Sequence, residues 1–186
     1  MKGFALKRTF VYIGQMSRSR LISDASVFQA VRRLLAESGD KAVTFSAVAQ
    51  ATGLAAPTLV QRYSSVAAMI QAALSSFCDQ LFAALDMAES TAPDTAKGAQ
   101  RLLKDLAESC PEVSEVNMFS TILRDPALRH RMTLWRQSLI AALAQRLDAR
   151  GEAAAILFAA WQGQMLWHPA GGQRFRLKDV IKAVSE

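Results

Sequence analysis

The side chains best suited to recognising another molecule lie in one short stretch, GLAAPTLVQRYSS, residues 53–65. Arg62 can bind a phosphate, or donate two hydrogen bonds to the O6/N7 edge of guanine, and Gln61 can bond the N6/N7 edge of adenine. Pro57 and Val60 offer apolar surface that can pack on thymine methyl groups. This chemistry suits the reading of a nucleic acid, provided that the stretch lies on an element that fits a groove.

No comparable set of catalytic or metal-binding side chains occurs elsewhere in the sequence. The two histidines, His130 and His168, stand far apart, and there is no HExxH motif, P-loop or nucleophile elbow. Cys78 and Cys110 also lie far apart without a neighbouring ligand, so we expect buried, unreactive thiols. The sequence therefore predicts a protein that is not an enzyme and that uses no metal and no cofactor.

Nearly every segment shows the apolar periodicity of an α-helix, and no segment alternates convincingly as a strand does. The predicted fold class is therefore all-α, with about nine helices. Local signals set several boundaries: Thr44 and Ser65 are expected N-caps, and Gly53 is an expected helix stop. The first expected helix starts from a cap at Ser23 or Asp24 and ends at Gly39. The others cover residues 45–51, 56–63, 66 to about 88, 95–109, 112–124, 127–149, 152–168 and 177–185.

Two of these helices, 45–51 and 56–63, are short and are joined by a tight turn at 52–55. With a longer helix before and after them, they make a helix-turn-helix. In that motif the second helix enters the DNA major groove with its N-terminus first. Proline is tolerated in the first turn of a helix, where its missing N–H has no intrahelical acceptor. Pro57 therefore marks the start of the reading helix and its DNA-facing end.

The span from Ser26 to about Leu74 resembles the TetR family of bacterial transcriptional regulators, on the segment TFSAVAQATGLAAPTLVQRYSSVAAMIQAAL. The resemblance implies an N-terminal three-helix DNA-binding domain and a C-terminal helical bundle that binds a small-molecule effector and forms a homodimer. The domains expected are a basic arm at 1–22, a helix-turn-helix domain at 23–75 and the helical bundle at 76–186. The residues that fall on the family pattern are Thr44, Val48, Ala49, Gly53, Leu54, Thr58, Leu59, Tyr63 and Ser65.

The sequence departs from that family pattern where DNA contacts are common. Val60 replaces an aromatic residue, Val66 replaces a lysine, and Ala56 and Pro57 stand where polar, small or glycine residues are usual. Each change removes a hydrogen-bond donor. Leu59 and Tyr63 are expected to face the core, although the Tyr63 hydroxyl could also reach a phosphate. The remaining candidate DNA-binding residues are Thr44, Ser46, Ala55, Ala56, Pro57, Thr58, Val60, Gln61, Arg62 and Tyr63, with Thr44 and Ser46 placed to bond phosphate.

The positive charge is concentrated at the N-terminus. Residues 1–22 carry five basic residues and no acid, which accounts for +5 of the net charge of +6. This arm is either a phosphate-binding segment or a solvated tail, and Met16 is a second candidate start. Its apolar piece, Phe10 to Gly14, is too short for a secretory signal, and no apolar run approaches the roughly 18 residues of a membrane helix. The prediction is a cytoplasmic protein without a membrane partner.

The C-terminal half is rich in apolar stripes at helical spacing, which form either a plain core or the wall of a cavity. The family resemblance implies a ligand cavity lined by aromatic and a few polar residues. The candidates are Phe119, Trp135, Trp161, Gln164 and His168. The segment 152–168 is rich in alanine and contains Gly163, and we expect it to form the dimer interface together with 177–185.

The function that these patterns favour is that of a ligand-responsive transcriptional regulator. It would act as a repressor that a small apolar or aromatic effector releases from a pseudo-palindromic operator. One alternative is a helical small-molecule or partner-binding protein whose DNA-reading surface has decayed, as the losses at Val60 and Val66 suggest. A second alternative, an all-α enzyme, is opposed by the absence of a polar constellation.

Overall fold

The computed structural model describes residues 23–111, 115–147, 151–171 and 176–185, so the basic arm expected at 1–22 lies outside the described residues. Within these ranges the regular elements are all helical, which confirms the all-α class. The α-helices there are α1 (Asp24–Ser38), α2 (Phe45–Thr52), α3 (Ala56–Tyr63), α4 (Val66–Thr91), α5 (Ala96–Ser109), α6 (Val116–Arg124), α7 (Pro126–Leu147), α8 (Gly151–Trp167) and α9 (Leu177–Ser185), with 3-10 turns η1 (Asp40–Ala42) and η3 (His168–Ala170).

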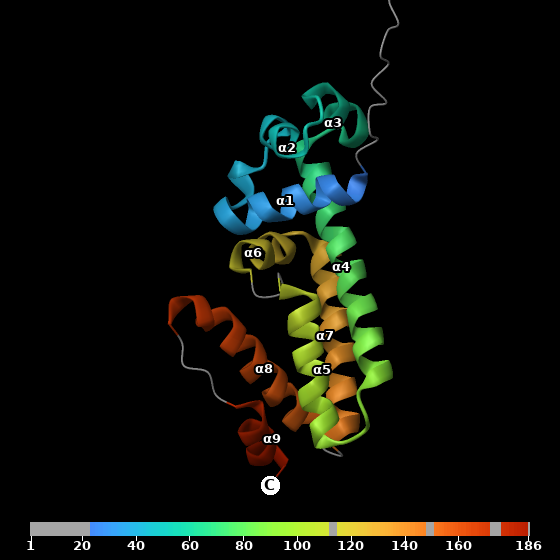
Figure 1. The fold of residues 1–186 in the computed structure, drawn as a ribbon, viewed down its shortest axis with the longest axis vertical. Coiled ribbons are helices and arrows are strands. Elements are labelled where there is room, and N and C mark those ends of the chain that lie inside the picture. The colour runs from blue at the N-terminus through green and yellow to red at the C-terminus, as the bar shows by residue number, and fades with distance from the viewer. Residues whose placement is uncertain (1–22, 112–114, 148–150, 172–175, 186) are drawn as a thin grey trace, which may run out of the picture.

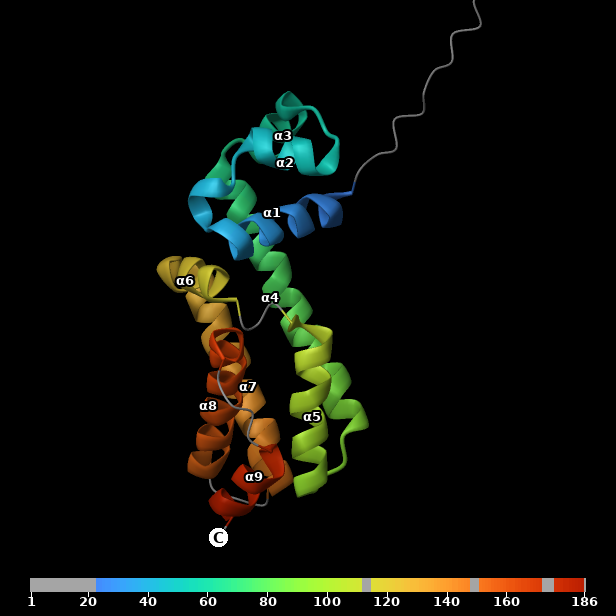
Figure 2. The same ribbon diagram turned by 60° about the vertical axis from the view of Figure 1, so that its left-hand side comes forward.

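The molecule is elongated, with α1, α2 and α3 grouped at one end (Figure 1). The long helix α4 runs from this group into a bundle that it forms with α5, α7 and α8. Helix α6 lies between α1 and the bundle and packs against both α1 and α7, whereas α9 covers α8 at the opposite end (Figure 2). The group of three short helices is therefore joined to the bundle by α4 and by α6.

Helix α4 is the shared element of the two parts. It has 26 residues and is therefore about 39 Å long. Its buried side chains, among them Met69, Leu74 and Leu81, face α1, α5 and α7. The domain boundary expected at 75–76 falls inside this continuous helix. Of the described helices, α4 alone is long and apolar enough to cross a membrane by length and composition, a test that core helices also pass.

Helix starts follow the local signals in the sequence. Thr44 and Ser65 each accept a backbone N–H in the first turn of their helix, at 3.0 Å and 3.1 Å. Gly53 ends α2 with a φ of 75°, a left-handed conformation that suits glycine. Asp125 accepts the N–H groups of Ala127 and Leu128, so it caps α7, and that helix begins at Pro126.

Most helix boundaries lie within one residue of the expected ones, and α4 runs to Thr91, about three residues past its expected end. Helix α6 begins at Val116, and residues 112–114 lie outside the described ranges. The described part of α7 ends at Leu147, and the expected end at 149 lies outside the described residues. Helix α8 ends at Trp167, so His168 belongs to η3 and does not continue the α8 stripe. This places the His168 side chain on the turn after the helix.

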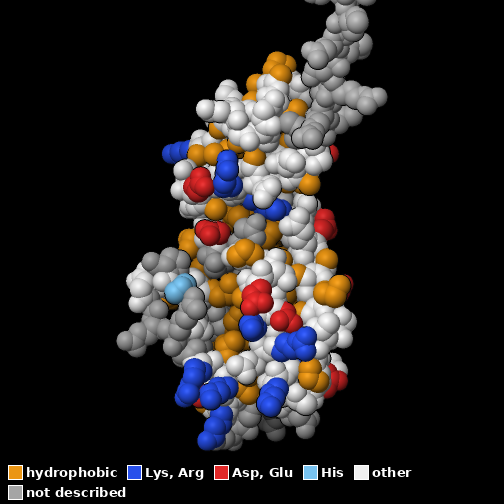
Figure 3. Space-filling view, in the orientation of Figure 1, with side chains coloured by type: hydrophobic (Ala, Val, Ile, Leu, Met, Phe, Trp, Pro, Cys, Tyr) orange, Lys and Arg blue, Asp and Glu red, His pale blue; other side chains and the backbone are white. Residues whose placement is uncertain are grey.

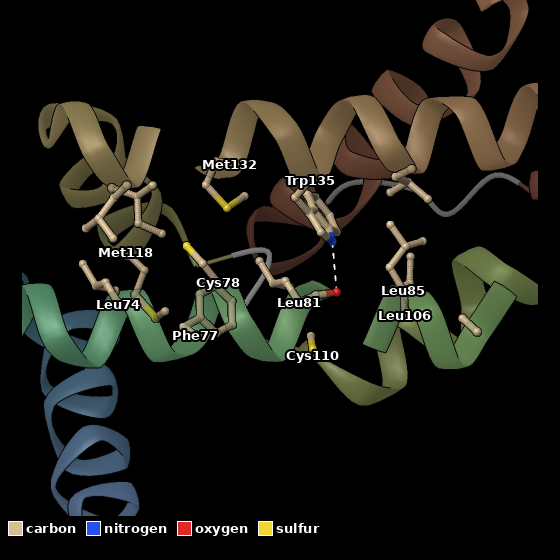
Figure 4. Close-up of a cluster of buried hydrophobic side chains, with 14 of the residues drawn as sticks. Leu74, Phe77, Cys78, Leu81, Leu85, Leu106, Cys110, Met118, Met132 and Trp135 are labelled. Atoms are coloured by element: carbon tan, nitrogen blue, oxygen red, sulfur yellow. Dashed lines mark hydrogen bonds between the residues drawn. The ribbon is translucent and has the colours of Figure 1, made fainter. Parts of the chain in front are cut away.

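The core of the bundle contains aromatic, aliphatic and sulfur-bearing side chains (Figure 4). Trp135 of α7 is buried there, and its indole Nε1–H donates to the backbone carbonyl of Leu81 on α4 at 3.1 Å. Cys78 and Cys110 are both buried, as expected. Burial raises the pKa of the Cys78 thiol, which disfavours the reactive thiolate.

Candidate nucleic-acid interface and ligand hollows

Helix α3 lies at the tip of the molecule and begins as its proline predicts. Ala55 has extended backbone angles and precedes the helix, and Pro57 is the second helical residue. Leu59 is completely buried, which fastens the helix to the three-helix core. The opposite side of α3 faces outward, so the short helix has one anchoring face and one face available to a partner.

The outward residues of the tip form what we call the reading surface. Those that are exposed are Thr44, Ser46, Ala55, Pro57, Val60, Gln61 and Arg62, whereas Ala56, Thr58 and Tyr63 are half-buried. The structure therefore brings the expected residues together on one end of the protein. The Thr44 hydroxyl accepts the Ala47 N–H as a helix cap, and its hydrogen can still be donated to a phosphate.

Charge is scarce on the reading surface. On the face seen in Figure 3, the tip shows mainly apolar and uncharged side chains, and the lysine and arginine side chains lie farther from it. Arg32 is buried in α1, where it donates to Gln80 at 3.1 Å and lies 5.7 Å from the Phe77 ring centroid. Val60 is 46% exposed, so the reading surface presents methyl groups at the position where the TetR-family pattern has a hydrogen-bond donor.

Asp24, which the sequence offered with Ser23 only as a candidate cap of the first helix, connects the start of α1 to the end of α3, whereas Ser23 is the cap. Its carboxylate accepts the Tyr63 hydroxyl at 2.5 Å and lies 3.6 Å from Nη1 of Arg62. The Tyr63 ring also packs against Phe28 of α1, with ring centroids 6.1 Å apart. Burial, together with the Asp24 carboxylate, raises the pKa of Tyr63 to about 12. Tyr63 therefore serves the core, and its hydroxyl is already engaged.

The candidate ligand residues do not meet in one cavity. Trp161, Gln164 and His168 line a hollow of about 370 Å³ between α5, α8 and the start of α9, which we call the large hollow. Phe119 and Trp135 line a separate hollow of about 110 Å³ between α6, α7 and α8, which we call the small hollow.

Three aromatic rings in mutual contact line the two hollows, Trp135 and Phe158 the small one and Trp161 the large one. The Trp135 and Phe158 ring centroids are 6.4 Å apart, and those of Phe158 and Trp161 are 6.1 Å apart. These rings are buried and pack edge to face or tilted, an arrangement favoured by their quadrupoles. Trp135 is thus mainly a core residue whose only donor is bonded to Leu81. Helical periodicity in the sequence thus identified the inward faces of the helices, but it did not predict that the candidate residues line two separate hollows.

Helix α8 also has an outer face. Leu157 and Trp161 point into the bundle and are buried, whereas Ile156 is 51% and Trp167 is 68% exposed. Ala159 is exposed on the same helix, and a Cβ added at Gly163 would meet no atom within 4 Å. The small residues therefore leave an accessible apolar strip on α8.

No group of three or more histidine, cysteine or acidic side chains that could hold a metal ion occurs among the described residues.

Solved structures with a similar fold are transcriptional regulators. A regulator from Rhodococcus sp. Rha1 aligns with a TM-score of 0.68 and 19% identity, over 88% of this chain and 94% of that one. LfrR, a TetR-like regulator from Mycobacterium smegmatis solved with proflavine, aligns with a TM-score of 0.64 and 19% identity, over 87% and 94%.

PfmR, a TetR-family regulator from Thermus thermophilus, aligns with a TM-score of 0.57 and 20% identity, over 86% of this chain and 94% of that one. No protein-family model matches the sequence, and no curated protein matches it either. The chain therefore has the TetR-like regulator fold, in which the helix-turn-helix and the helical bundle are the two expected parts.

Proposed function

We propose that the protein is a ligand-responsive, DNA-binding transcriptional regulator that acts as a repressor. The observation that carries the proposal is the anchoring of α3: Leu59 holds its inner face, while Pro57 and Gln61 stay exposed on its outer face. The Arg62 side chain beside them is 26% exposed. This is the arrangement that a helix needs to enter a major groove. The similar fold of known regulators supports the same function.

The proposed form is a homodimer through the exposed strip of α8 and through α9. Exposed apolar strips with small residues suit close helix packing, and Ile156 and Trp167 would be covered in the dimer. A two-fold axis would place two α3 helices about 34 Å apart, or a multiple of that distance, on a pseudo-palindromic operator.

The proposed effector is a small apolar or aromatic molecule in the large hollow. Its volume of about 370 Å³ lies within the range of roughly 300–1,000 Å³ that is common for ligand pockets. Release of DNA would follow if the effector binds better to a conformation in which the two reading helices no longer match adjacent grooves.

Selection of bound DNA from a random library tests DNA recognition, followed by affinity measurements on the selected sequence at several salt concentrations. We expect log K to fall linearly with log salt, with a slope of about −0.9 per phosphate contact. Arg62→Ala should weaken binding and reduce the size of that slope by about one contact. Arg101→Ala is the matched control, because the Arg101 side chain is exposed and lies on α5, far from the reading surface. Absence of sequence preference at every salt concentration contradicts the proposal.

The second candidate is a helical ligand-binding protein whose reading surface has decayed. Its specific support is that Arg62 faces the Asp24 carboxylate and that Val60 presents no donor. A salt slope near zero, together with retained binding of a small molecule, favours this candidate over the regulator.

A further inference from the structure

The small hollow combines apolar walls with two cationic side chains. Phe119 of α6, Met132 of α7 and Phe158 of α8 supply apolar surface. Arg129 and Arg136 of α7 add two positive charges, Thr133 and Gln162 add neutral polar groups, and no carboxylate is among the lining residues. A hollow of this kind attracts a molecule that has an apolar body and a negative charge.

The charge of the surrounding helices is strongly one-sided. Helices α6, α7 and α8 together carry five arginines and a single acid, Glu152, in the first turn of α8. Asp125, just before α7, is engaged by Gln71 and by two backbone N–H groups. Neither Glu152 nor Asp125 lines the small hollow, so its lining carries two positive charges and no negative one.

Three of the five arginines have structural partners outside the hollow. Arg124 pairs with Asp40 at 3.0 Å, and Arg131 pairs with Asp79 and bonds Ser75. Arg146 is buried and donates to backbone carbonyls, including those of Glu89 and Ala92. The remaining two are the ones that line the small hollow.

Arg129 and Arg136 have no carboxylate partner among the described residues. Nη1 of Arg129 donates to the Leu123 carbonyl at 3.2 Å, and the Arg136 guanidinium lies 5.6 Å from the Phe158 ring centroid. Because they are seven residues apart, they stand two turns apart on one face of α7, about 10.5 Å along its axis. Each has five N–H donors, so most of its donors remain for a ligand.

We propose that the small hollow binds a compact organic anion, with an apolar body about the size of one six-membered ring and a single carboxylate. The body would displace water from Phe119 and Phe158, and the carboxylate would accept charge-assisted hydrogen bonds from Arg136, Arg129 or both. The volume of about 110 Å³ suits a compact ligand. This site is distinct from the large hollow and does not depend on DNA binding.

Calorimetric titration of the full chain with cyclohexanecarboxylate tests the proposal, with the neutral cyclohexanecarboxamide as the matched ligand. We expect saturable binding of the carboxylate and at least tenfold weaker binding of the amide. Arg136→Gln, Arg129→Gln or both should weaken carboxylate binding by about tenfold or more, the usual effect of losing a hydrogen bond to a charged group. Arg101→Gln removes the same charge from an exposed position on α5 and should leave the affinity unchanged.

Two further variants locate the site. Phe119→Trp should fill the hollow and abolish carboxylate binding without changing the charge, and circular dichroism verifies that each variant is folded. If Lys104→Gln weakens binding and the two α7 variants do not, the anion occupies the large hollow and the proposal is wrong. Equal binding of the amide and the carboxylate also overturns it. If the protein binds DNA selectively but does not bind the carboxylate, only the anion site is refuted. If it binds the carboxylate but shows no selective DNA binding, only the proposed regulator function is refuted.

Discussion

The Tyr63 hydroxyl donates a hydrogen bond to the Asp24 carboxylate at 2.5 Å, which joins the last residue of α3 to the first residue of α1. The contact closes the three-helix unit at the edge where the reading helix ends. Asp24 also favours the N-terminus of α1 electrostatically, because acidic groups there interact well with the helix dipole. The orientation of α3 thus depends on a polar contact as well as on the burial of Leu59.

Removal of this hydrogen bond should lower stability in a pH-dependent way. Tyr63→Phe should lower the free energy of unfolding by about 1 kcal/mol near neutral pH, measured by urea denaturation. The pKa of Tyr63 is raised from 10.0 to about 12 in the folded protein. The neutral phenol is therefore favoured by folding, so this contribution is present below pH 10 and is lost as the pH rises to about 12.

Comparison of the wild type with Tyr63→Phe isolates the contribution of the Tyr63 hydroxyl, because all other groups titrate in both proteins. The difference in unfolding free energy between wild type and Tyr63→Phe should shrink between pH 10 and pH 12. A difference that stays constant over this range would show that the phenol does not titrate as its surroundings indicate.

Neutralisation of Asp24 should strengthen DNA binding. Its carboxylate lies 3.6 Å from the Arg62 guanidinium and competes with phosphate for it. Asp24→Asn keeps an acceptor for Tyr63 and removes the charge, so we expect operator affinity to rise about threefold to tenfold, the value of about one phosphate contact.

The matched control for Asp24→Asn is Glu37→Gln, which removes one exposed acid near the other end of the same helix. Its effect on operator affinity should be clearly smaller, and Asp24→Asn in an Arg62→Ala background should give little gain. If Glu37→Gln tightens binding equally, the effect of Asp24 is one of net charge only, and Arg62 is not restrained by it.

The features that sequence could predict are those set by neighbouring residues. Thr44, Gly53 and Ser65 act within one helical turn, and each performs the capping or stopping role expected of it. Pro57 likewise reports the start of α3, because its effect on the backbone is local. The contact of Asp24 with Tyr63 gave no such signal, since 39 residues separate them and only the packing of α1 against α3 brings them together.

The ligand residues show the same limit more sharply. Periodicity placed Trp135 and Trp161 on inward faces correctly, and both are buried. It could not reveal that the Phe158 ring packs against both of them, or that the candidate residues line two separate hollows. Helix spacing records direction, whereas the shape of a cavity depends on rotamers and on helix crossing, which involve distant parts of the chain.

The close approach of α5 to the preceding turn should make Gly98 intolerant of a side chain. A Cβ built there lies 1.7 Å from the Pro93 carbonyl oxygen, a backbone atom that cannot rotate away. Gly98→Ala should therefore lower the free energy of unfolding by about 1–3 kcal/mol or more, as overpacking does. Gly163→Ala, where the added methyl meets no atom within 4 Å, should cause no loss. Equal unfolding midpoints for the two variants in urea would contradict the tight packing at Gly98.

Helix α6 should carry the effect of a ligand from the small hollow to the reading surface. Phe119 and Leu123 line the hollow, while Asn117 donates to the Ala36 carbonyl at 3.0 Å and Arg124 pairs with Asp40 at 3.0 Å. A shift of α6 on ligand binding would therefore pull on the end of α1 and on η1. These surface contacts contribute little to stability, about 0–1 kcal/mol each, so their loss should leave the fold intact.

The double variant Asn117→Ala/Arg124→Gln tests this link through operator affinity with and without saturating cyclohexanecarboxylate. We expect the anion to weaken operator binding of the wild type and to do so much less in the double variant. Calorimetric affinity for the anion should be similar in both proteins, because neither substituted residue lines the hollow. A reduction in operator binding as large as that of the wild type would show that the signal bypasses these two contacts, and no reduction in the wild type would separate the anion site from regulation.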